Sequence, residues 1–220
     1  MRPQFEPMVG RYFSMEVEGE PCRVYVEEAG AGIPLLCLHT AGSDGRQFRH
    51  LMTDEAITQR FRVIAFDMPW HGKSNPPPGY RDREYRLTTD LYRHTVRAFC
   101  AAYGLDRPVV MGCSMGGRIV LHLALEHPDE FAAVIALEGA DRLEAYYDLE
   151  WLHRPDVHGG EIQAAFVSGQ IAPQSPDEYR WETLWHYMQG GPGVFKGDLY
   201  FYWHDGHFDD RSTRIDLSLI

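Results

Sequence analysis

The stretch Pro108-Val109-Val110-Met111-Gly112-Cys113-Ser114-Met115-Gly116-Gly117 decides how this chain of 220 residues is organised. It begins with a short apolar run, typical of a buried strand, and continues into the pattern G-x-S-x-G. A helical pattern follows over 117–127 and ends at Pro128. A serine on so sharp a turn projects its hydroxyl above the sheet, and the flanking glycines let neighbouring chains approach closely. The pattern predicts Ser114 as a nucleophile, because a serine that only caps a helix would not need these glycines.

Further strands and helices are expected on both sides of this stretch. Three more apolar runs are typical of buried strands: 34–38, 61–66 and 131–137. Helical spacing of apolar residues occupies 46–58 and 88–103, and the second of these has Thr88 and Thr89 as cap candidates and Gly104 at its end. The alternation predicts an α/β fold with a mostly parallel sheet and helices on both faces. Two partly alternating stretches, 12–17 and 22–28, predict an antiparallel hairpin at one sheet edge.

Composition limits the function classes. The chain is 44% hydrophobic and 24% charged, which is ordinary for a globular domain with a sizeable core. Its formal charge of −11 argues against binding to nucleic acid. No stretch approaches the roughly 18 apolar residues of a membrane span, and residues 1–13 lack the apolar segment of a signal peptide. Four cysteines without CxxC spacing suit a reducing compartment, so we expect a cytoplasmic protein.

The composition changes after Ala140. Residues 141–210 contain most of the net negative charge and four of the five tryptophans. We expect residues 1–140 to form the core, 141–210 to form an inserted helical cap, and 211–220 to begin the return to the core.

Three motifs resemble the α/β-hydrolase fold family over roughly Tyr12 to Asp141. Leu36-Cys37-Leu38-His39-Thr40-Ala41-Gly42 is similar to the family's strand and His-Gly-x, with Thr40 in place of the usual glycine. Asp67-Met68-Pro69-Trp70-His71-Gly72-Lys73-Ser74 is similar to its Asp-x-Pro-Gly-x-Gly-x-Ser loop, with Trp70 where glycine is common. The third motif is the G-x-S-x-G turn. The resemblance implies that Ser114 is the nucleophile, that the Ala41 and Met115 N–H groups form the oxyanion hole, and that no cofactor or metal is needed.

The resemblance also implies an acid and a histidine that follow the serine in the chain. Glu138 and Asp141 leave the strand that ends at Leu137, and Glu138 is the acid candidate because it is nearer the strand. A solvated loop carboxylate or a helix cap is the alternative for both. His207 is similar to the histidine of a Gly-His-Phe ending, but it precedes the position of the family's last two strands. No such strands are visible, so we expect a truncated chain whose end, 214–220, resembles the approach to the first of them.

Other histidines have structural interpretations. His39 and His71 are expected to hydrogen-bond the backbone and shape the motif loops, and His122 is expected to pack in its helix. A rival hypothesis takes a cluster near the end of the chain as a zinc or manganese site. Its members are His204, Asp205, His207, Asp209 and Asp210.

The sequence thus predicts an esterase-like serine hydrolase that acts on a carboxylic ester, thioester or related carbonyl compound. The aromatic cap favours a small-molecule substrate with an apolar acyl or aryl group, although aromatic side chains also build a cap's own core. The alternative is a catalytically impaired, hydrolase-like ligand-binding protein or remnant. Exposed sheet edges would favour association, including a homo-oligomer.

Overall fold

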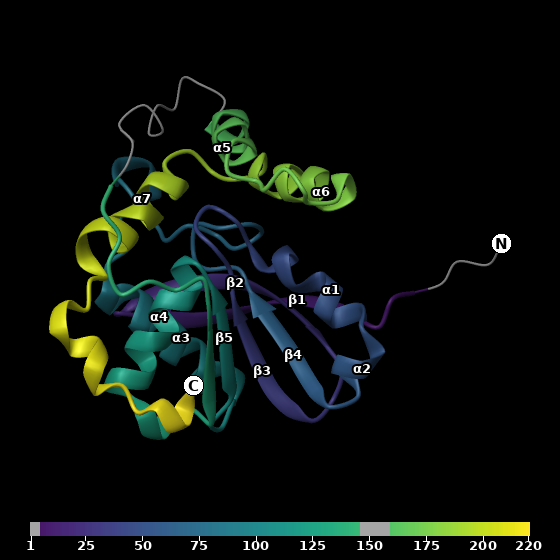
Figure 1. Ribbon diagram of the computed structural model, residues 1–220, viewed down its shortest axis with the longest axis vertical. Coiled ribbons are helices and arrows are strands. Elements are labelled where there is room, and N and C mark those ends of the chain that lie inside the picture. Colours follow the sequence, from purple (N-terminus) through teal and green to yellow (C-terminus); the bar gives the residue numbers. More distant parts are fainter. Residues whose placement is uncertain (1–4, 146–158) are drawn as a thin grey trace.

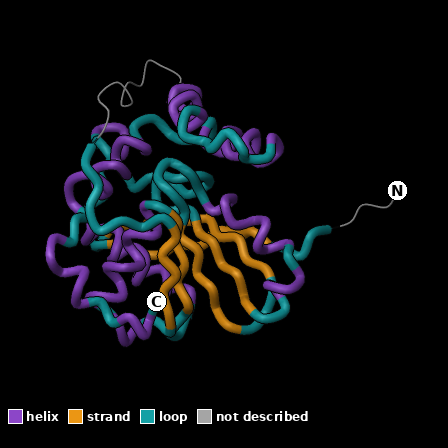
Figure 2. The backbone as a smooth tube through the Cα atoms, viewed as in Figure 1, coloured by secondary structure: helices purple, strands orange, loops and turns teal. Residues whose placement is uncertain are grey.

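The computed structural model describes residues 5–145 and 159–220. Within them one six-stranded sheet has the order β1-β2-β4-β3-β5-β6 (Figures 1 and 2). Strands β3 to β6 run parallel, and the β1–β2 hairpin adds antiparallel to β4 at one edge. The expected α/β fold with a hairpin at the sheet edge is therefore confirmed. The strand bounds are β1 Val9–Val17, β2 Glu20–Ala29, β3 Ile33–Leu38, β4 Phe61–Phe66, β5 Val109–Cys113 and β6 Ala133–Leu137.

Side chains alternate along each strand, so strand β3 contributes to a core on each face of the sheet. Leu36 and Leu38 of β3 enter the larger core, with helices α3 (Thr89–Tyr103) and α4 (Met115–Glu126). Leu35 and Cys37 enter the smaller core on the opposite face, together with Phe48 and Met52. This two-sided burial explains why the strand sequences read as continuous apolar runs.

Local signals fix the ends of α3. The Thr88 hydroxyl accepts the Leu91 N–H at 3.1 Å, and Gly104 ends the helix with a φ of 70°. Both features match the expected caps.

The prediction of one continuous helix over 46–58 is wrong. The chain forms a 3₁₀ turn at Gly45–Phe48 and then two short helices, α1 (Arg49–Thr53) and α2 (Glu55–Thr58). Asp54 separates them, because its backbone is extended and its carboxylate accepts the Ala56 N–H at 2.8 Å. An aspartate that caps a new helix competes with continuation of the old one.

A helical segment, 159–205, lies beyond the carboxyl ends of the parallel strands (Figure 1). It contains α5 (Gly159–Ser168), α6 (Asp177–Tyr187), α7 (Val194–Tyr200) and a π-helical turn, Phe201–Asp205. The expected helices are present in this part of the chain, while residues 146–158 of the expected cap lie outside the described residues.

The last residues fold back towards the sheet. They form 3₁₀ turns at Asp209–Arg214 and Leu217–Leu219, and the second turn contacts β6. Leu219 packs against the larger core.

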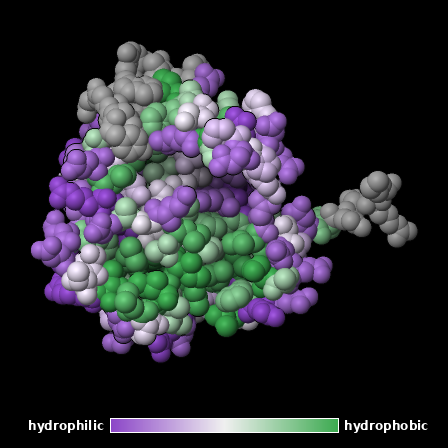
Figure 3. Space-filling view, in the orientation of Figure 1, coloured by the Kyte–Doolittle hydropathy of each residue, from purple (hydrophilic) through white to green (hydrophobic). Residues whose placement is uncertain are grey.

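Hydrophobic side chains gather over the strands on the face seen in Figure 3. Ile135 and Leu137 of β6 are 40% and 43% exposed, and Leu217 beside this strand is 77% exposed. Strand β6 is the last of the sheet, so within the described ranges its outer edge has no strand partner. None of the helices in 5–145 and 159–220 is long and apolar enough to cross a membrane.

Candidate active site

Ser114 lies on the turn between β5 and α4 in a conformation that side chains rarely adopt. Its φ is 54° and its ψ is −108°. The Ser114 N–H donates to Leu137 O at 2.8 Å, which ties the turn to the end of β6. Its side chain makes no capping hydrogen bond to α4, so helix capping does not account for the serine. A strained backbone held by its surroundings is typical of a functional site.

Glycines allow this turn to form because backbone atoms press against each of them. A Cβ at Gly112 would lie 2.1 Å from Gly116 O, and one at Gly116 would lie 2.3 Å from Leu38 O. A Cβ at Gly117 would lie 2.4 Å from Leu137 O. The first turn of α4 therefore fits closely between the ends of β3 and β6.

Two buried residues, Ala41 and Met115, carry the backbone N–H groups that the sequence predicts as oxyanion donors. Met115 follows Ser114 directly, and Ala41 lies in the turn after β3, whose end lies against Gly116. Ala41 and Met115 are 4% and 0% exposed. Across the described ranges, no backbone acceptor pairs with either N–H. Most buried N–H groups in proteins are paired, and a buried N–H group without a backbone acceptor can donate to a ligand atom.

The turn that carries Ala41 is Thr40–Ser43. The Ser43 N–H donates to Thr40 O at 3.2 Å, and Gly42 has a φ of 66°. Such a turn requires positive φ at its third residue, where glycine is favoured. Thr40 can replace the family's glycine because the positive φ of this turn falls at Gly42 and not at Thr40. The Gln47 side chain also accepts the Thr40 N–H at 2.9 Å.

His39 is a neutral, buried histidine. Its Nδ1 lies 3.0 Å from Thr40 O, and its Nε2 accepts the Met68 N–H at 3.2 Å. Burial, reinforced by the charge of His71, lowers the pKa of His39 to about 4. His39 therefore joins the turn after β3 to the loop after β4, as the sequence predicts.

His71 is the member of this pair whose pKa is raised. Its Nδ1 lies 3.0 Å from Pro69 O and its Nε2 lies 2.8 Å from Asp198 Oδ2. A carbonyl and a carboxylate both accept hydrogen bonds, so this geometry favours a proton on each ring nitrogen. Burial opposes that charge, but the Asp198 charge and hydrogen bond raise the pKa of His71 above its ordinary value.

Asp198 is the functional candidate that the sequence analysis missed. It comes from α7, its side chain is 0% exposed, and it also accepts from the Gly42 N–H at 2.7 Å and the Tyr85 hydroxyl at 2.9 Å. In sequence it is one of many acids in 141–210. The one available signal is that buried apolar residues, Val194, Phe195 and Leu199, surround it in its helix.

Asp67 anchors the loop after β4. Its carboxylate accepts the Gly45 N–H at 2.8 Å and the Lys73 N–H at 2.7 Å. Burial and the nearby Asp44 charge raise the pKa of Asp67 to about 6. In the same loop Trp70 has a φ of 78°, so this tryptophan takes the left-handed conformation that the family's glycine would adopt easily.

Glu138 follows β6 directly, also with positive φ, at 52°. It is exposed, and its Oε2 lies 3.8 Å from Cys113 Sγ, one residue before the nucleophile candidate. Asp141 is exposed as well, and its backbone carbonyl accepts the Phe208 N–H at 3.1 Å. The Glu138 carboxylate therefore lies next to the strand residue that precedes Ser114.

His207 is not brought to Ser114. Its Nε2 lies 2.6 Å from Trp203 O, in the π-helical turn that precedes it. The residues of the rival metal cluster are also engaged elsewhere or exposed, and the described ranges contain no group of three or more ligands that could hold a metal ion. Asp205, for example, accepts the Thr89 N–H and so caps α3.

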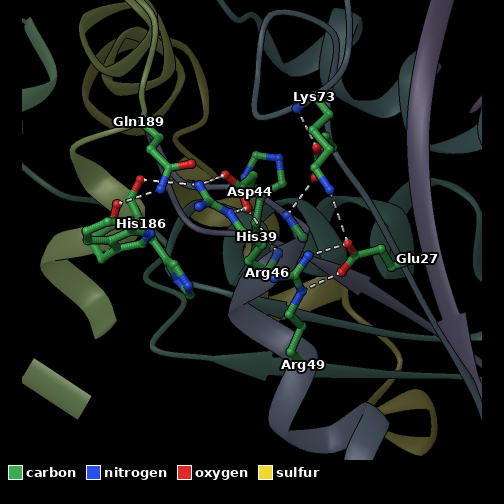
Figure 4. A network of polar contacts seen from close by, with 12 residues as sticks. Glu27, His39, Asp44, Arg46, Arg49, Lys73, His186 and Gln189 are labelled. Carbon is green, nitrogen blue, oxygen red and sulfur yellow. Dashed lines mark hydrogen bonds and ion pairs between the residues drawn. The ribbon is translucent and has the colours of Figure 1, made fainter. Parts of the chain in front are cut away.

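The helical segment also contacts the core beside the turn 40–43. Figure 4 shows Arg46 between the Asp44 carboxylate and the carbonyl of His186 in α6. The neighbouring Glu27 binds Arg49 at 2.8 Å and lies 3.7 Å from the Lys73 ammonium. Polar contacts therefore join the loops after β3 and β4 to each other and to α6.

Comparison with known proteins shows the family of this chain. Residues 33–165 match the model of the alpha/beta hydrolase fold. The chain belongs to the alpha/beta hydrolase fold family.

Relatives in this family differ in chemistry. A protein of Mycobacterium phage D29 described as a non-heme haloperoxidase is 31% identical over 131 residues, which are 60% of this chain and 45% of that protein. A 2-hydroxymuconate semialdehyde hydrolase of Pseudomonas sp. CF600 is 29% identical over 141 residues, 63% of this chain and 46% of that protein. The matched stretches thus span about half the length of these relatives.

A solved hydrolase structure from Pseudomonas aeruginosa PA01 has the same fold. It superposes with a TM-score of 0.73 at 17% identity and covers 93% of this chain and 77% of that chain. The alpha/beta hydrolase fold therefore extends over nearly all of the chain.

Proposed function

We propose that this protein is an esterase-like serine hydrolase, with Ser114 as its nucleophile. One observation carries the proposal: a strained serine stands between β5 and α4, and among the described residues the N–H groups of buried Ala41 and Met115 have no backbone acceptor. A tetrahedral intermediate of acyl transfer needs this combination of nucleophile and oxyanion donors.

The chemistry runs through a covalent acyl-enzyme. The Ser114 oxygen bonds to the substrate carbonyl carbon, and the carbonyl electron pair moves to the oxygen held by the two N–H groups. The carbon–oxygen bond to the leaving group then breaks, and the leaving alcohol takes a proton. Water attacks the acyl-enzyme in the same way and releases the acid.

A general base must take the serine proton. Among the described residues no histidine hydrogen-bonds the Ser114 hydroxyl, and His207 is engaged with Trp203 O. We assign Glu138 as the acid that orients the base, because it leaves β6 beside Cys113 and Ser114. An acid in this place fixes the tautomer of an imidazole.

The substrate we propose is a small molecule with an apolar acyl or aryl group. The helical segment 159–205 acts as a cap over the strand ends, and Tyr187 and Phe195 face one another there with ring centroids 6.3 Å apart. Burial raises the pKa of Tyr187 to about 12, and Thr40 and Cys113 are among the groups that affect it. An aromatic wall beside the oxyanion turn suits an apolar substrate group.

The proposal is tested by hydrolysis of short p-nitrophenyl esters. We expect Ser114-dependent turnover with acetyl or butyryl esters, and no turnover by Ser114→Ala. Cys113→Ala is the matched control, because it removes the adjacent thiol and leaves the serine. Equal rates for wild type and Ser114→Ala would remove Ser114 from the mechanism.

A second candidate is a hydrolase-like binding protein. It is favoured by one observation, that no histidine in the described ranges is paired with the serine. It predicts that a non-hydrolysable apolar ester analogue binds while no acyl-enzyme forms. Calorimetry with the analogue, together with mass measurement after mixing with the ester, separates the two candidates.

A further inference from the structure

Asp198 connects three parts of the chain that are far apart in sequence. Its Oδ2 accepts from the Gly42 N–H and lies 2.8 Å from His71 Nε2, and its Oδ1 accepts from the Tyr85 hydroxyl. The helix α7 therefore reaches both the turn after β3 and the loop after β4 through one carboxylate.

Gly42 is held from both sides by the helical segment. Its N–H donates to Asp198, and its carbonyl accepts the Gln163 side-chain amide of α5 at 2.8 Å. A Cβ at this glycine would lie 2.0 Å from Gln163 Nε2 and 2.9 Å from the ring of Phe195. The backbone next to Ala41 is thus closely enclosed by side chains of α5 and α7.

The buried charges of Asp198 and His71 compensate each other only while the two side chains stay in contact. Asp198 and His71 are both fully buried at their side chains, and His71 also faces His39, Asp67 and Tyr85. A buried ion that loses its partner is strongly destabilised. Withdrawal of α7 would leave His71 and the Gly42 N–H without their acceptor, so the turn and the helix are energetically coupled.

We propose that Asp198 is a positioning residue that holds the turn Thr40–Ser43, and with it the Ala41 N–H, in the shape that receives an oxyanion. The proposal rests on the serine hydrolase function proposed above. A purely structural role would instead tie α7 to the core and leave the reactivity of Ser114 unchanged.

The test compares Asp198→Asn with Glu182→Gln. Asn keeps the size of the side chain but removes its charge. Glu182 of α6 lies 2.7 Å from His50 of α1, so its variant weakens another contact between the helical segment and the core without touching the turn. The probe is a fluorophosphonate, which reacts with an activated serine and places an oxygen in the oxyanion hole.

We expect Asp198→Asn to lower the maximal rate of Ser114 labelling at least tenfold, with little change in the probe concentration that gives half of that rate. One lost oxyanion donor lowers rates by about 10²–10³-fold, so a displaced donor should have a readily measured effect. Glu182→Gln should stay within twofold of wild type. A labelling rate for folded Asp198→Asn that also stays within twofold would overturn the proposal.

Two further measurements cover the remaining cases. Gln163→Met removes the hydrogen bond that the Gln163 amide donates to Gly42 O. If Asp198→Asn fails to fold, this variant tests the same turn. A labelling rate like that of wild type would then count against the proposal. Amide hydrogen exchange at Ala41 and Gly42 does not depend on Ser114 chemistry. If wild type is not labelled, the proposed function fails, and the positioning of the turn is judged by whether Asp198→Asn speeds exchange at these two amides.

Discussion

The Asp198 carboxylate accepts the Gly42 N–H at 2.7 Å across a separation of 156 positions in the chain. Gly42 follows Ala41, the first of the two proposed oxyanion donors. One helix beyond the sheet thereby contacts the turn on which the proposed chemistry depends.

Glu138→Gln tests the assigned acid. We expect the rate of ester hydrolysis to fall, because an amide does not orient the general base that takes the Ser114 proton as a carboxylate does. Asp141→Asn is the matched control and should hydrolyse the ester at the wild-type rate. Equal, small effects of both changes would show that neither carboxylate orients a base.

Gly116→Ala tests the close approach of α4 to β3. The added Cβ would lie 2.3 Å from Leu38 O, so backbone atoms must shift, and we expect a loss of about 1–3 kcal/mol in the free energy of unfolding. Gly159→Ala is the control, because its Cβ would meet Pro192 Cα at 3.7 Å, an ordinary contact. Urea unfolding gives both values, and identical midpoints for the two variants would contradict the packing described here.

His122 gives a pH dependence whose sign follows from its burial. Burial lowers the pKa of His122 to about 4, so the folded protein keeps this ring neutral while the unfolded chain takes up a proton near pH 6.5. Its contribution to stability is complete above pH 6.5 and is lost as the pH falls towards 4, by at most roughly 3 kcal/mol.

Other groups titrate in the same range, so the measurement compares variants. The pKa of Asp67 is raised to about 6, so protonation of this group stabilises the folded protein as the pH falls below that value. The pKa of His39 is lowered to about 4, so His39, like His122, destabilises the fold as the pH falls. Urea unfolding from pH 7.5 to 4.5 should give a shallower loss for His122→Gln than for wild type. His204→Gln, a change at an exposed ring, should keep the wild-type slope. Parallel curves for wild type and His122→Gln would show that this histidine titrates normally.

The outer face of β6 predicts self-association. Ile135 and Leu137 are exposed on a strand whose outer edge pairs with no other strand in the described part of the chain, an arrangement that favours contact with another chain. Light scattering should show association that rises with protein concentration and decreases in Ile135→Lys. A wild-type chain that stays monomeric at the highest soluble concentration would count against this surface as a contact site.

The parts of the fold that local patterns determine could be predicted from the sequence. Buried strands read as apolar runs, Thr88 and Gly104 mark the ends of α3, and the glycines around Ser114 follow from backbone contacts that no side chain allows. The break at Asp54 was missed because apolar spacing continues across it while its carboxylate caps a new helix. Local competition of this kind is not visible in hydrophobic periodicity.

Asp198 could not be identified from sequence because its role depends on long-range contacts. Its partners, Gly42, His71 and Tyr85, come from three separate parts of the chain. An acidic residue in an acidic stretch reads as solvated, and only the fold shows that this one is buried against a histidine. The pairing of His71 was missed for the same reason.

The most direct test of the central claim is the intact mass of the protein after mixing with a fluorophosphonate. The account predicts one covalent adduct, located at Ser114 by peptide mapping, that is absent from Ser114→Ala and present in Cys113→Ala. A folded wild-type chain that gains no adduct, or that gains one at Cys113 instead, would contradict the assignment of Ser114 as the nucleophile.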